Sequence, residues 1–166
     1  MKLSRESYYG LSALAYMATC PPGTILQADE LAESADLPKT FLAKILYKLA
    51  RHAILRSYRG KERGYELARA PKDLTVKEVV EVLDGLDIFE RCVFWSNECS
   101  DDAPCPLHET WATVRPVIAT LMEQITLAHV ASGKHIPGID AVLGPSRLPR
   151  ALKSRKSKPR KSSAQS

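Results

Sequence analysis

The sequence predicts a mainly α-helical protein, with a winged helix-turn-helix domain, a small β-hairpin wing and a long C-terminal dimerisation helix. Three amphipathic segments followed by a basic hairpin segment give the element order of a winged helix-turn-helix. Farther along, apolar residues repeat at the alternating three- and four-residue spacing of a helix that pairs with another helix. With 166 residues, the chain is long enough for one such domain and an accessory segment.

The first three predicted helices cover residues 4–19, 28–35 and 38–52, where apolar side chains recur at the spacing of one helical face. Pro21-Pro22-Gly23 ends the first helix, because proline and glycine interrupt helical patterns. Pro38 is expected at the first position of the third helix, where a backbone N–H would have no partner.

The third helix has an apolar face and a cationic face. Its apolar positions are Leu42, Ile45, Leu46 and Leu49. The other face and the start of the helix carry hydrogen-bond donors: Lys39, Thr40, Lys44, Tyr47, Lys48 and Arg51. Residues 37–61 contain no acidic residue, whereas a merely solvated face usually mixes both signs of charge. Because these donors suit phosphates and base edges of the major groove, we expect this helix to recognise double-stranded DNA.

Two β-prone runs predict a hairpin wing, since they flank a turn with glycine at both ends, residues 60–64. The whole block 37–72 carries ten basic and two acidic residues, a net charge of +8, which is typical of a site for a polyanion. The tip of the wing is expected to reach the DNA backbone or the adjacent minor groove through Arg59, Lys61 and Arg63.

Two further helices are predicted in the second half of the chain. Thr75 and Glu78 form a capping-box pattern at the start of the first, which ends at Gly85. The second runs from Glu109 to about Ala131, and Pro116 is expected to kink it. Its apolar residues are spaced 3, 4, 3, 4 and 3 apart: Trp111, Val114, Ile118, Leu121, Ile125 and Ala128. Such a helix either covers its own domain or pairs with its twin, and the regular spacing favours a homodimer.

The chain therefore divides into five predicted parts. They are a DNA-binding domain at 1–72, a linking helix at 73–91, a cysteine-rich sensor loop at 92–108, a dimerisation helix at 109–132 and a basic tail at 133–166. The tail is rich in Lys, Arg, Ser and Pro, so we expect it to be disordered and to add non-specific affinity for DNA. No apolar run is long enough to span a membrane, and we expect a cytoplasmic protein.

Three cysteines and a histidine lie close together in the predicted sensor loop, in the pattern C-x6-C-x5-C-x2-H: Cys92, Cys99, Cys105 and His108. The spacing alone leaves three interpretations open. An iron–sulfur cluster accepts three thiolates and a histidine at uneven spacing. Zinc accepts the same ligand set but usually takes closely spaced pairs. A metal-free thiol switch is the third interpretation. Cys20 stands apart and is expected to be a packed or half-exposed thiol.

Several segments resemble the IscR/NsrR/RirA superfamily of bacterial transcription regulators, over about residues 1–131. They are the N-terminal Met1-Lys2-Leu3-Ser4, the wing from Arg59-Gly60 to Gly64-Tyr65-Glu66-Leu67-Ala68-Arg69, the helix Val79-Val80-Glu81-Val82-Leu83-Asp84-Gly85, and Cys105-Pro106-Leu107-His108. The resemblance implies a homodimer of winged helix-turn-helix domains crossed by long C-terminal helices. It also implies that Cys92, Cys99 and Cys105 hold a [2Fe–2S] or [4Fe–4S] cluster, with His108 at the position of a histidine ligand.

An enzyme is not predicted, because the chain has no glycine-rich phosphate loop, no G-x-S-x-G and no H-E-x-x-H pattern. We expect a homodimeric transcription regulator that binds a roughly palindromic operator. An iron–sulfur cluster or the redox state of the thiols would control its operator affinity, with zinc or no metal as the alternatives. A second class of function is a cluster-carrying interaction protein whose basic tail binds RNA or an acidic partner.

Overall fold

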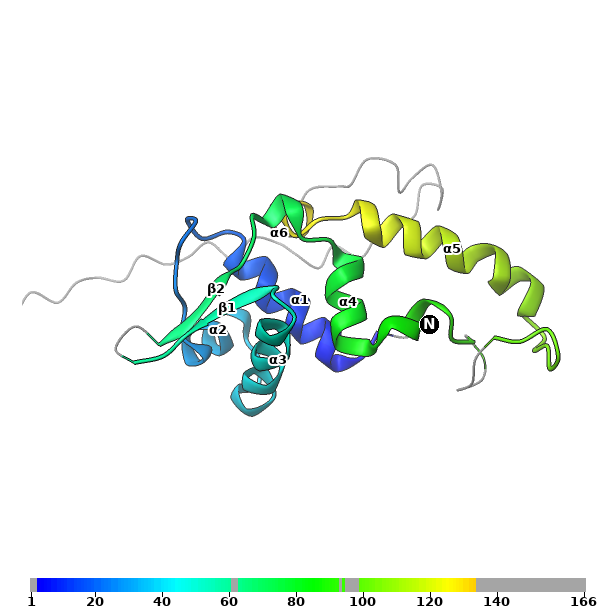
Figure 1. The fold of residues 1–166 in the computed structure, drawn as a ribbon, viewed down its shortest axis with the longest axis horizontal. Helices are drawn as coiled ribbons and strands as arrows, with labels where there is room; N and C mark the ends of the chain where they lie inside the picture. Colours follow the sequence, from blue (N-terminus) through cyan, green and yellow to red (C-terminus); the bar gives the residue numbers. More distant parts are fainter. Residues whose placement is uncertain (1–2, 61–62, 93, 95–98, 134–166) are drawn as a thin grey trace, which may run out of the picture. The chain divides into compact units, whose positions relative to one another are not determined.

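The computed structural model describes residues 3–133 except 61–62, 93 and 95–98. The described chain is mainly helical, and Figure 1 shows one antiparallel hairpin among the helices, which confirms the predicted fold class. None of the described helices is long and apolar enough to cross a membrane. The elements, in order, are α1 (Arg5–Met17), α2 (Ala28–Ala35), α3 (Lys39–Arg51), β1 (Leu55–Tyr58), β2 (Gly64–Leu67), η1 (Pro71–Asp73), α4 (Val76–Asp84), η2 (Leu86–Phe89), α5 (His108–Gln124) and α6 (Leu127–Ser132).

Local capping sets where the first three helices begin. The Ser4 hydroxyl accepts a hydrogen bond from the Ser7 N–H at 3.1 Å, which satisfies one of the free N–H groups at the start of α1. At α2, the Glu30 carboxylate accepts from the Gln27 N–H at 2.8 Å. The third helix begins one residue later than predicted, because Pro38 has an extended backbone and serves as its N-cap.

Helices α1, α2 and α3 share one hydrophobic core with the strands of the wing, and residues of α4 and α6 complete it. The predicted apolar positions of α3 are all buried, and Leu42, Leu46 and Leu49 are fully enclosed. Helix α1 packs so closely against α4 that a Cβ atom at Gly10 would come within 2.4 Å of Leu83 Cδ1. Since burying a leucine contributes roughly 1.5–3 kcal/mol, this core fixes α3 firmly against its neighbours.

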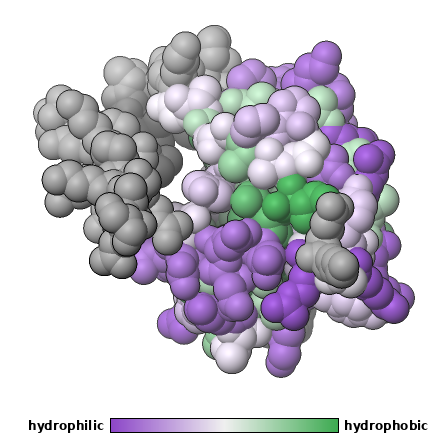
Figure 2. Space-filling model, turned by 90° about the vertical axis from the view of Figure 1, so that its left-hand side faces the viewer, coloured by the Kyte–Doolittle hydropathy of each residue, from purple (hydrophilic) through white to green (hydrophobic). Residues whose placement is uncertain are grey.

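The wing is tied at its base to the segment that precedes α2. Strands β1 and β2 pair antiparallel, with Leu55 opposite Leu67. The Leu26 N–H donates to the Tyr65 carbonyl at 2.9 Å, and the Tyr65 N–H donates back to the Leu26 carbonyl at 2.8 Å. Figure 2 views this end of the molecule and shows mainly hydrophilic side chains around a small apolar area. Of the predicted tip residues, Lys61 lies outside the described residues.

Helix α4 begins and ends where the sequence predicts. The Thr75 hydroxyl accepts a hydrogen bond from the Glu78 N–H at 3.1 Å. The Glu78 carboxylate pairs with Arg69 instead of with the Thr75 N–H, so the capping box is only half formed. Gly85 ends the helix with a φ of 102°, a conformation that residues with a side chain rarely adopt.

The single C-terminal helix expected from the apolar spacing is in fact two helices, α5 and α6, separated by Ile125 and Thr126. The Val76 N–H donates to the Ile125 carbonyl at 2.8 Å, and the Leu127 N–H donates to the Leu74 carbonyl at 2.9 Å. The Thr126 side chain caps α6. Pairing with the extended segment before α4 overrides the helical spacing, which corrects the expectation of one continuous helix.

The apolar repeat of the C-terminal helices is divided between two environments. Ile118 and Ile125 pack against a second small core of their own chain, whereas Val114 is 40% exposed and the neighbouring Val117 is 39% exposed. The repeat therefore does not form one continuous exposed stripe. In Figure 1, α5 extends beyond α4. The buried residues of this second core are Val76, Val80, Ile88 and Phe89.

Candidate DNA-binding surface and sensor loop

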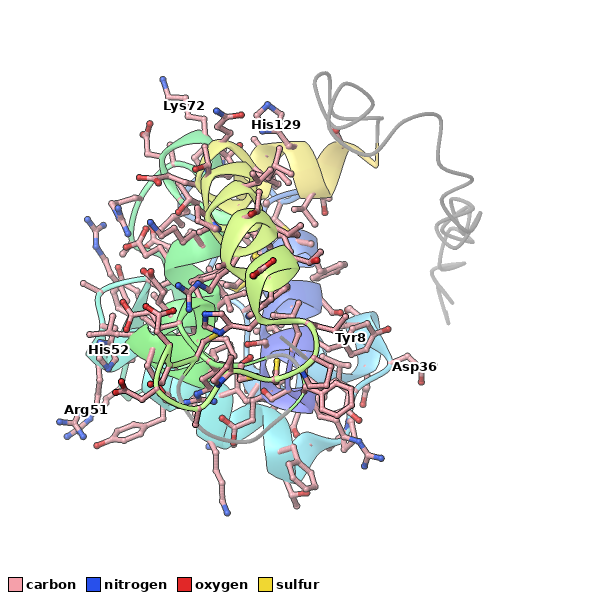
Figure 3. All side chains as sticks on the ribbon, turned by 90° about the vertical axis from the view of Figure 1, so that its right-hand side faces the viewer. Tyr8, Asp36, Arg51, His52, Lys72 and His129 are labelled. Carbon is pink, nitrogen blue, oxygen red and sulfur yellow. The ribbon has the colours of Figure 1, made fainter. Side chains whose placement is uncertain are left out.

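The outer face of α3 exposes four of the predicted DNA-binding residues. Thr40, Lys44, Tyr47 and Arg51 are all exposed to solvent. Neither Lys44 nor Arg51 forms an ion pair with another described residue. In Figure 3 the Arg51 side chain points away from the helices. Both charges are therefore free, within the described part of the chain, to meet a polyanion.

Lys39 is also exposed, but acidic residues of α2 surround its ammonium group. Its Nζ lies 3.4 Å from Asp29 Oδ1 and 3.5 Å from Glu33 Oε1. The Asp29 carboxylate is the main cause of the raised pKa of Lys39. In this state Lys39 therefore contacts α2. Exposed ion pairs of this kind are weak and break readily.

Lys48 lies at the edge of the outer face, where its side chain is 42% exposed and its ammonium group contacts other elements, which refines the helical-wheel assignment. Its Nζ donates a hydrogen bond to the Leu83 carbonyl at 2.7 Å and lies 3.7 Å from Glu6 Oε2. Lys48 follows the buried Ile45 by three positions, so it lies at the border of the apolar stripe, next to α4. The wheel assigned it to the outer face because it could not show which element borders that stripe.

The wing adds further cations to the molecule. Arg59 and Arg63 are both exposed, on either side of the undescribed tip. The Tyr58 hydroxyl donates to Glu66 Oε2 at 2.6 Å, and this hydrogen bond raises the pKa of Tyr58. The acidic residue in β2 is thus engaged within the hairpin, away from the two arginines.

The four predicted cofactor ligands come together as two pairs. The sulfur atoms of Cys92 and Cys105 are 3.6 Å apart, and both residues are buried. The Cys99 sulfur lies 3.3 Å from His108 Nδ1. Burial raises the pKa of the Cys105 thiol. Within the described residues, no three His, Cys, Asp or Glu donors converge on a point that a single metal ion could occupy.

Asp101 is a functional candidate that sequence reasoning missed. Its Oδ1 lies 2.7 Å from His108 Nε2, and because a carboxylate oxygen can only accept, Nε2–H donates the hydrogen bond between them. The lone pair of Nδ1 is then left toward Cys99. A carboxylate that fixes a histidine tautomer in this way is a common partner of metal-binding histidines. In the sequence Asp101 is one of two adjacent aspartates in a turn-rich segment, and nothing there singles it out.

Side chains of α5 hold the backbone immediately before Cys92. The Trp111 Nε1–H donates to the Arg91 carbonyl at 3.0 Å, and Arg115 Nη1 donates to the Glu90 carbonyl at 2.9 Å. Trp111 is itself buried. Because of these bonds, the first thiol of the sensor loop occupies a defined place beside the start of α5.

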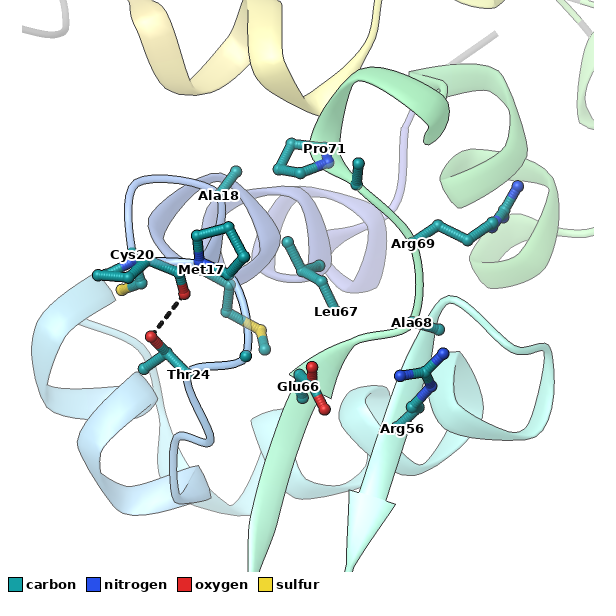
Figure 4. A pocket seen from close by; sticks show the side chains of 14 residues that line it. Met17, Ala18, Cys20, Thr24, Arg56, Glu66, Leu67, Ala68, Arg69 and Pro71 are labelled. Atoms are coloured by element: carbon teal, nitrogen blue, oxygen red, sulfur yellow. Dashed lines mark hydrogen bonds between the residues drawn. The ribbon is translucent and has the colours of Figure 1, made fainter.

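Cys20 is partly exposed, in agreement with the prediction, and lies apart from these four donors in the sequence. Its thiol donates to the Tyr16 carbonyl at 3.7 Å. It helps to line a pocket of about 420 Å³ at the base of the wing, where Figure 4 shows Arg56 and Arg69 on the opposite side.

Residues 3–133 match the Rrf2 family model, described as an iron-dependent transcriptional regulator. An HTH-type transcriptional regulator of Mycobacterium tuberculosis is 32% identical over 133 residues, which cover 80% of this chain and 83% of that protein. The family and this relative are both described as transcriptional regulators.

Solved structures show the same fold. CymR, the global cysteine regulator of B. subtilis, aligns with a TM-score of 0.68 at 22% identity, over 81% of this chain and 99% of its own. IscR of T. potens aligns with a TM-score of 0.63 at 23% identity, over 85% and 96% of the two chains. The family match over residues 3–133 and the 32% identity to the mycobacterial relative show that the chain belongs to the Rrf2 family of transcriptional regulators.

Proposed function

We propose that the protein is a homodimeric DNA-binding regulator whose operator affinity depends on an iron–sulfur cluster held by Cys92, Cys99, Cys105 and His108. The observation that carries this proposal is the arrangement of the four donors in two close pairs, one of two thiols and one of a thiol and an imidazole.

The spacing within each pair is that of two ligands on one metal. Two thiolates bound tetrahedrally at about 2.3 Å lie about 3.8 Å apart, and the Cys92 and Cys105 sulfurs are separated by 3.6 Å. A thiolate and an imidazole on one metal lie about 3.6 Å apart by the same geometry, close to the 3.3 Å between Cys99 and His108. A [2Fe–2S] cluster takes two protein ligands on each iron, so two pairs favour it over a [4Fe–4S] cluster, which takes one ligand on each iron.

The residues of this chain would prepare the site for such a group. The Asp101 carboxylate holds His108 in the tautomer whose Nδ1 can act as a ligand. Trp111 and Arg115 hold the backbone that leads into Cys92. A bound cluster would make the site sensitive to nitric oxide, oxygen or iron supply. The protein can convert this state into a change in DNA affinity only if one state binds DNA more tightly, typically by about 1–3 kcal/mol.

On DNA, α3 would enter the major groove with Thr40, Lys44, Tyr47 and Arg51 on its outer face. Lys39 would exchange its acidic partners on α2 for phosphate, because exposed ion pairs are weak. The wing would reach the flanking backbone or minor groove. Its cations there are Arg59, Arg63 and, outside the described residues, Lys61.

The exposed valines of α5 support a homodimer, since a second copy would cover them. We therefore expect Val117→Asp to convert a dimer into a monomer in analytical ultracentrifugation, because it would bury an unpaired charge in the contact. Glu123→Gln, at an exposed position of the same helix, is the control and should leave the mass unchanged. A wild-type monomer at micromolar concentration would contradict the dimer.

Anaerobic purification tests the cluster directly. We expect a coloured protein that contains iron and acid-labile sulfide and binds tightly to a duplex selected by the wild type from random-sequence DNA. A colourless protein with stoichiometric zinc would overturn the cluster. A colourless, metal-free protein whose DNA binding responds to thiol oxidants would establish the thiol switch instead, for which the 3.6 Å between Cys92 and Cys105 offers a route.

A truncation distinguishes the regulator from a protein that acts through its basic tail. A chain ending at residue 133 should still bind the selected duplex, because the proposed contacts lie in α3 and the wing. Loss of all nucleic-acid binding in the truncated chain would favour the interaction protein whose tail binds RNA or an acidic partner.

A further inference from the structure

Two cations from different parts of the chain meet at the C-terminal end of α4. The Lys48 ammonium donates to the Leu83 carbonyl at 2.7 Å, and Arg91 Nη2 donates to the Asp84 carbonyl at 3.1 Å. Carbonyl groups in the last turn of a helix have no partner within the helix, and the helix dipole favours positive charge there. The two side chains together therefore satisfy and stabilise this helix end.

Arg91 is held rigidly in this position. Its Nε and Nη2 donate to the two carboxylate oxygens of Asp87 at 2.8 and 2.9 Å, a two-bond contact that raises the pKa of Arg91 and lowers that of Asp87. Gly85 makes this geometry possible, because a Cβ atom there would lie 2.8 Å from Asp87 Oδ1. The turn after α4 thus admits Arg91 in one defined arrangement.

The two side chains that bind the end of α4 come from α3 and from the residue next to Cys92, the two regions that a sensor must connect. Lys48 belongs to α3, the proposed recognition helix, and its side chain also lies near Glu6 of α1. Arg91 directly precedes Cys92, and its carbonyl is held by Trp111. The end of α4 is consequently the place where α3 and the residue that precedes the sensor loop contact adjacent carbonyl groups.

We propose that Lys48 and Arg91 are positioning residues that couple the state of the sensor loop to the orientation of α3 through the Leu83 and Asp84 carbonyls. Movement of Cys92 would displace Arg91, change how the end of α4 is held, and so alter the contact that Lys48 makes with it. This inference rests on the proposed control of DNA affinity by the sensor loop. It assigns to Lys48 a role other than phosphate binding.

The test compares Lys48→Met with Lys44→Met in the full-length protein. For each variant, the dissociation constant for the selected duplex is measured with the cluster present and after its removal, and the ratio of the two constants is taken. Lys44 lies one turn earlier on α3 and is fully available to DNA. Lys44→Met should weaken DNA binding equally with and without the cluster, so the ratio of the two dissociation constants stays the same. It should also reduce the slope of log affinity against log salt concentration by about one. Where the wild-type ratio of dissociation constants is fivefold or more, Lys48→Met should reduce it to less than twofold.

Arg91→Lys gives a second, independent measurement, since it keeps the charge but removes the two-bond contact with Asp87. It should also reduce the ratio, and the double variant should reduce it no further than either single change, because both act through one contact. The visible spectrum reports whether each variant still holds its cluster. Should Arg91→Lys lose the chromophore, the ratio in Lys48→Met decides, because Lys48 lies on α3, outside the sensor loop.

The outcomes separate the two proposals. A wild-type ratio of one contradicts cluster control, and the coupling falls with it. A wild-type ratio of fivefold or more that persists in Lys48→Met contradicts the coupling alone. Equal weakening of both forms by Lys48→Met, as for Lys44→Met, would make Lys48 an ordinary phosphate contact.

Discussion

The DNA-binding half and the sensor half of this chain are stabilised by different kinds of interaction. In the first, α1, α2, α3 and the wing, closed off by apolar residues of α4 and α6, enclose fully buried leucines and isoleucines such as Leu14, Leu46 and Ile54. In the second, a small core is supplemented by individual hydrogen bonds from Arg91 and Trp111. Apolar packing is spread over many contacts, whereas a hydrogen bond depends on two atoms. The first half therefore suits a rigid reading surface, and the second suits a response to a local chemical change.

The largest expected effect is a loss of stability when a side chain is removed from the buried core of the first half. Leu46→Ala should lower the free energy of unfolding by about 2–5 kcal/mol, because it removes a fully buried side chain and leaves a cavity. Thermal denaturation followed by circular dichroism measures it. The neighbouring Tyr47→Ala is the control: it is exposed, so stability should change by no more than about 0.5 kcal/mol while DNA binding weakens. Equal destabilisation by both would contradict the described orientation of α3.

A thiol substitution in the sensor loop should instead change the visible spectrum and the affinity for DNA. We expect Cys105→Ala to abolish the visible chromophore and to shift operator affinity by about 1–3 kcal/mol, with the same loss of colour in Cys92→Ala and Cys99→Ala. Absorption spectra and fluorescence anisotropy with the selected duplex measure the two effects. Cys20→Ala should change neither, and an unaltered spectrum in Cys105→Ala would remove it from the ligand set.

A smaller effect is expected for the carboxylate that orients His108. Asp101→Ala should increase the rate of chromophore loss by about tenfold or less, at the low end for such partners because the aspartate is exposed. The decay of the absorption in air measures it. Asp102→Ala removes the adjacent exposed carboxylate and should decay like the wild type. Identical decay of both variants would leave Asp101 without a role in the site.

The smallest expected effect concerns a polar group in the core of the first half. The hydroxyl of Ser7 is buried and finds no hydrogen-bond partner among the described residues. Ser7→Ala should therefore leave stability unchanged or raise it by up to about 1 kcal/mol, since it removes a desolvated polar group. Ser12→Ala, whose hydroxyl donates to the Tyr8 carbonyl at 2.8 Å on the exposed side of α1, is the comparison. A marked loss of stability in Ser7→Ala would reveal a partner for that hydroxyl.

The two halves also differ in how far their sequence predicts them. The apolar stripe of α3 and the hairpin follow from local periodicity, so their positions are confirmed to within a residue or two. The break at Ile125 and Thr126 depends on pairing with Leu74 and Val76, about fifty residues earlier, which no local pattern shows. The contact of Lys48 with the Leu83 carbonyl likewise depends on where α4 ends. The pairing of the three cysteines and His108, and the contact of Asp101 with His108, arise from the path of a loop, which spacing does not specify.

Helix α5 is fastened to its own chain near both ends. Trp111 and Arg115 bind the backbone before Cys92, and the Ile125 carbonyl accepts a hydrogen bond from Val76. A rod fixed in this way cannot spin about its axis without breaking one set of these bonds. These contacts within the chain therefore fix the direction in which Val114 and Val117 face. In the proposed homodimer, α4 would orient a second copy that docks on these valines, so contacts within each single chain would set the spacing of the two DNA-binding surfaces.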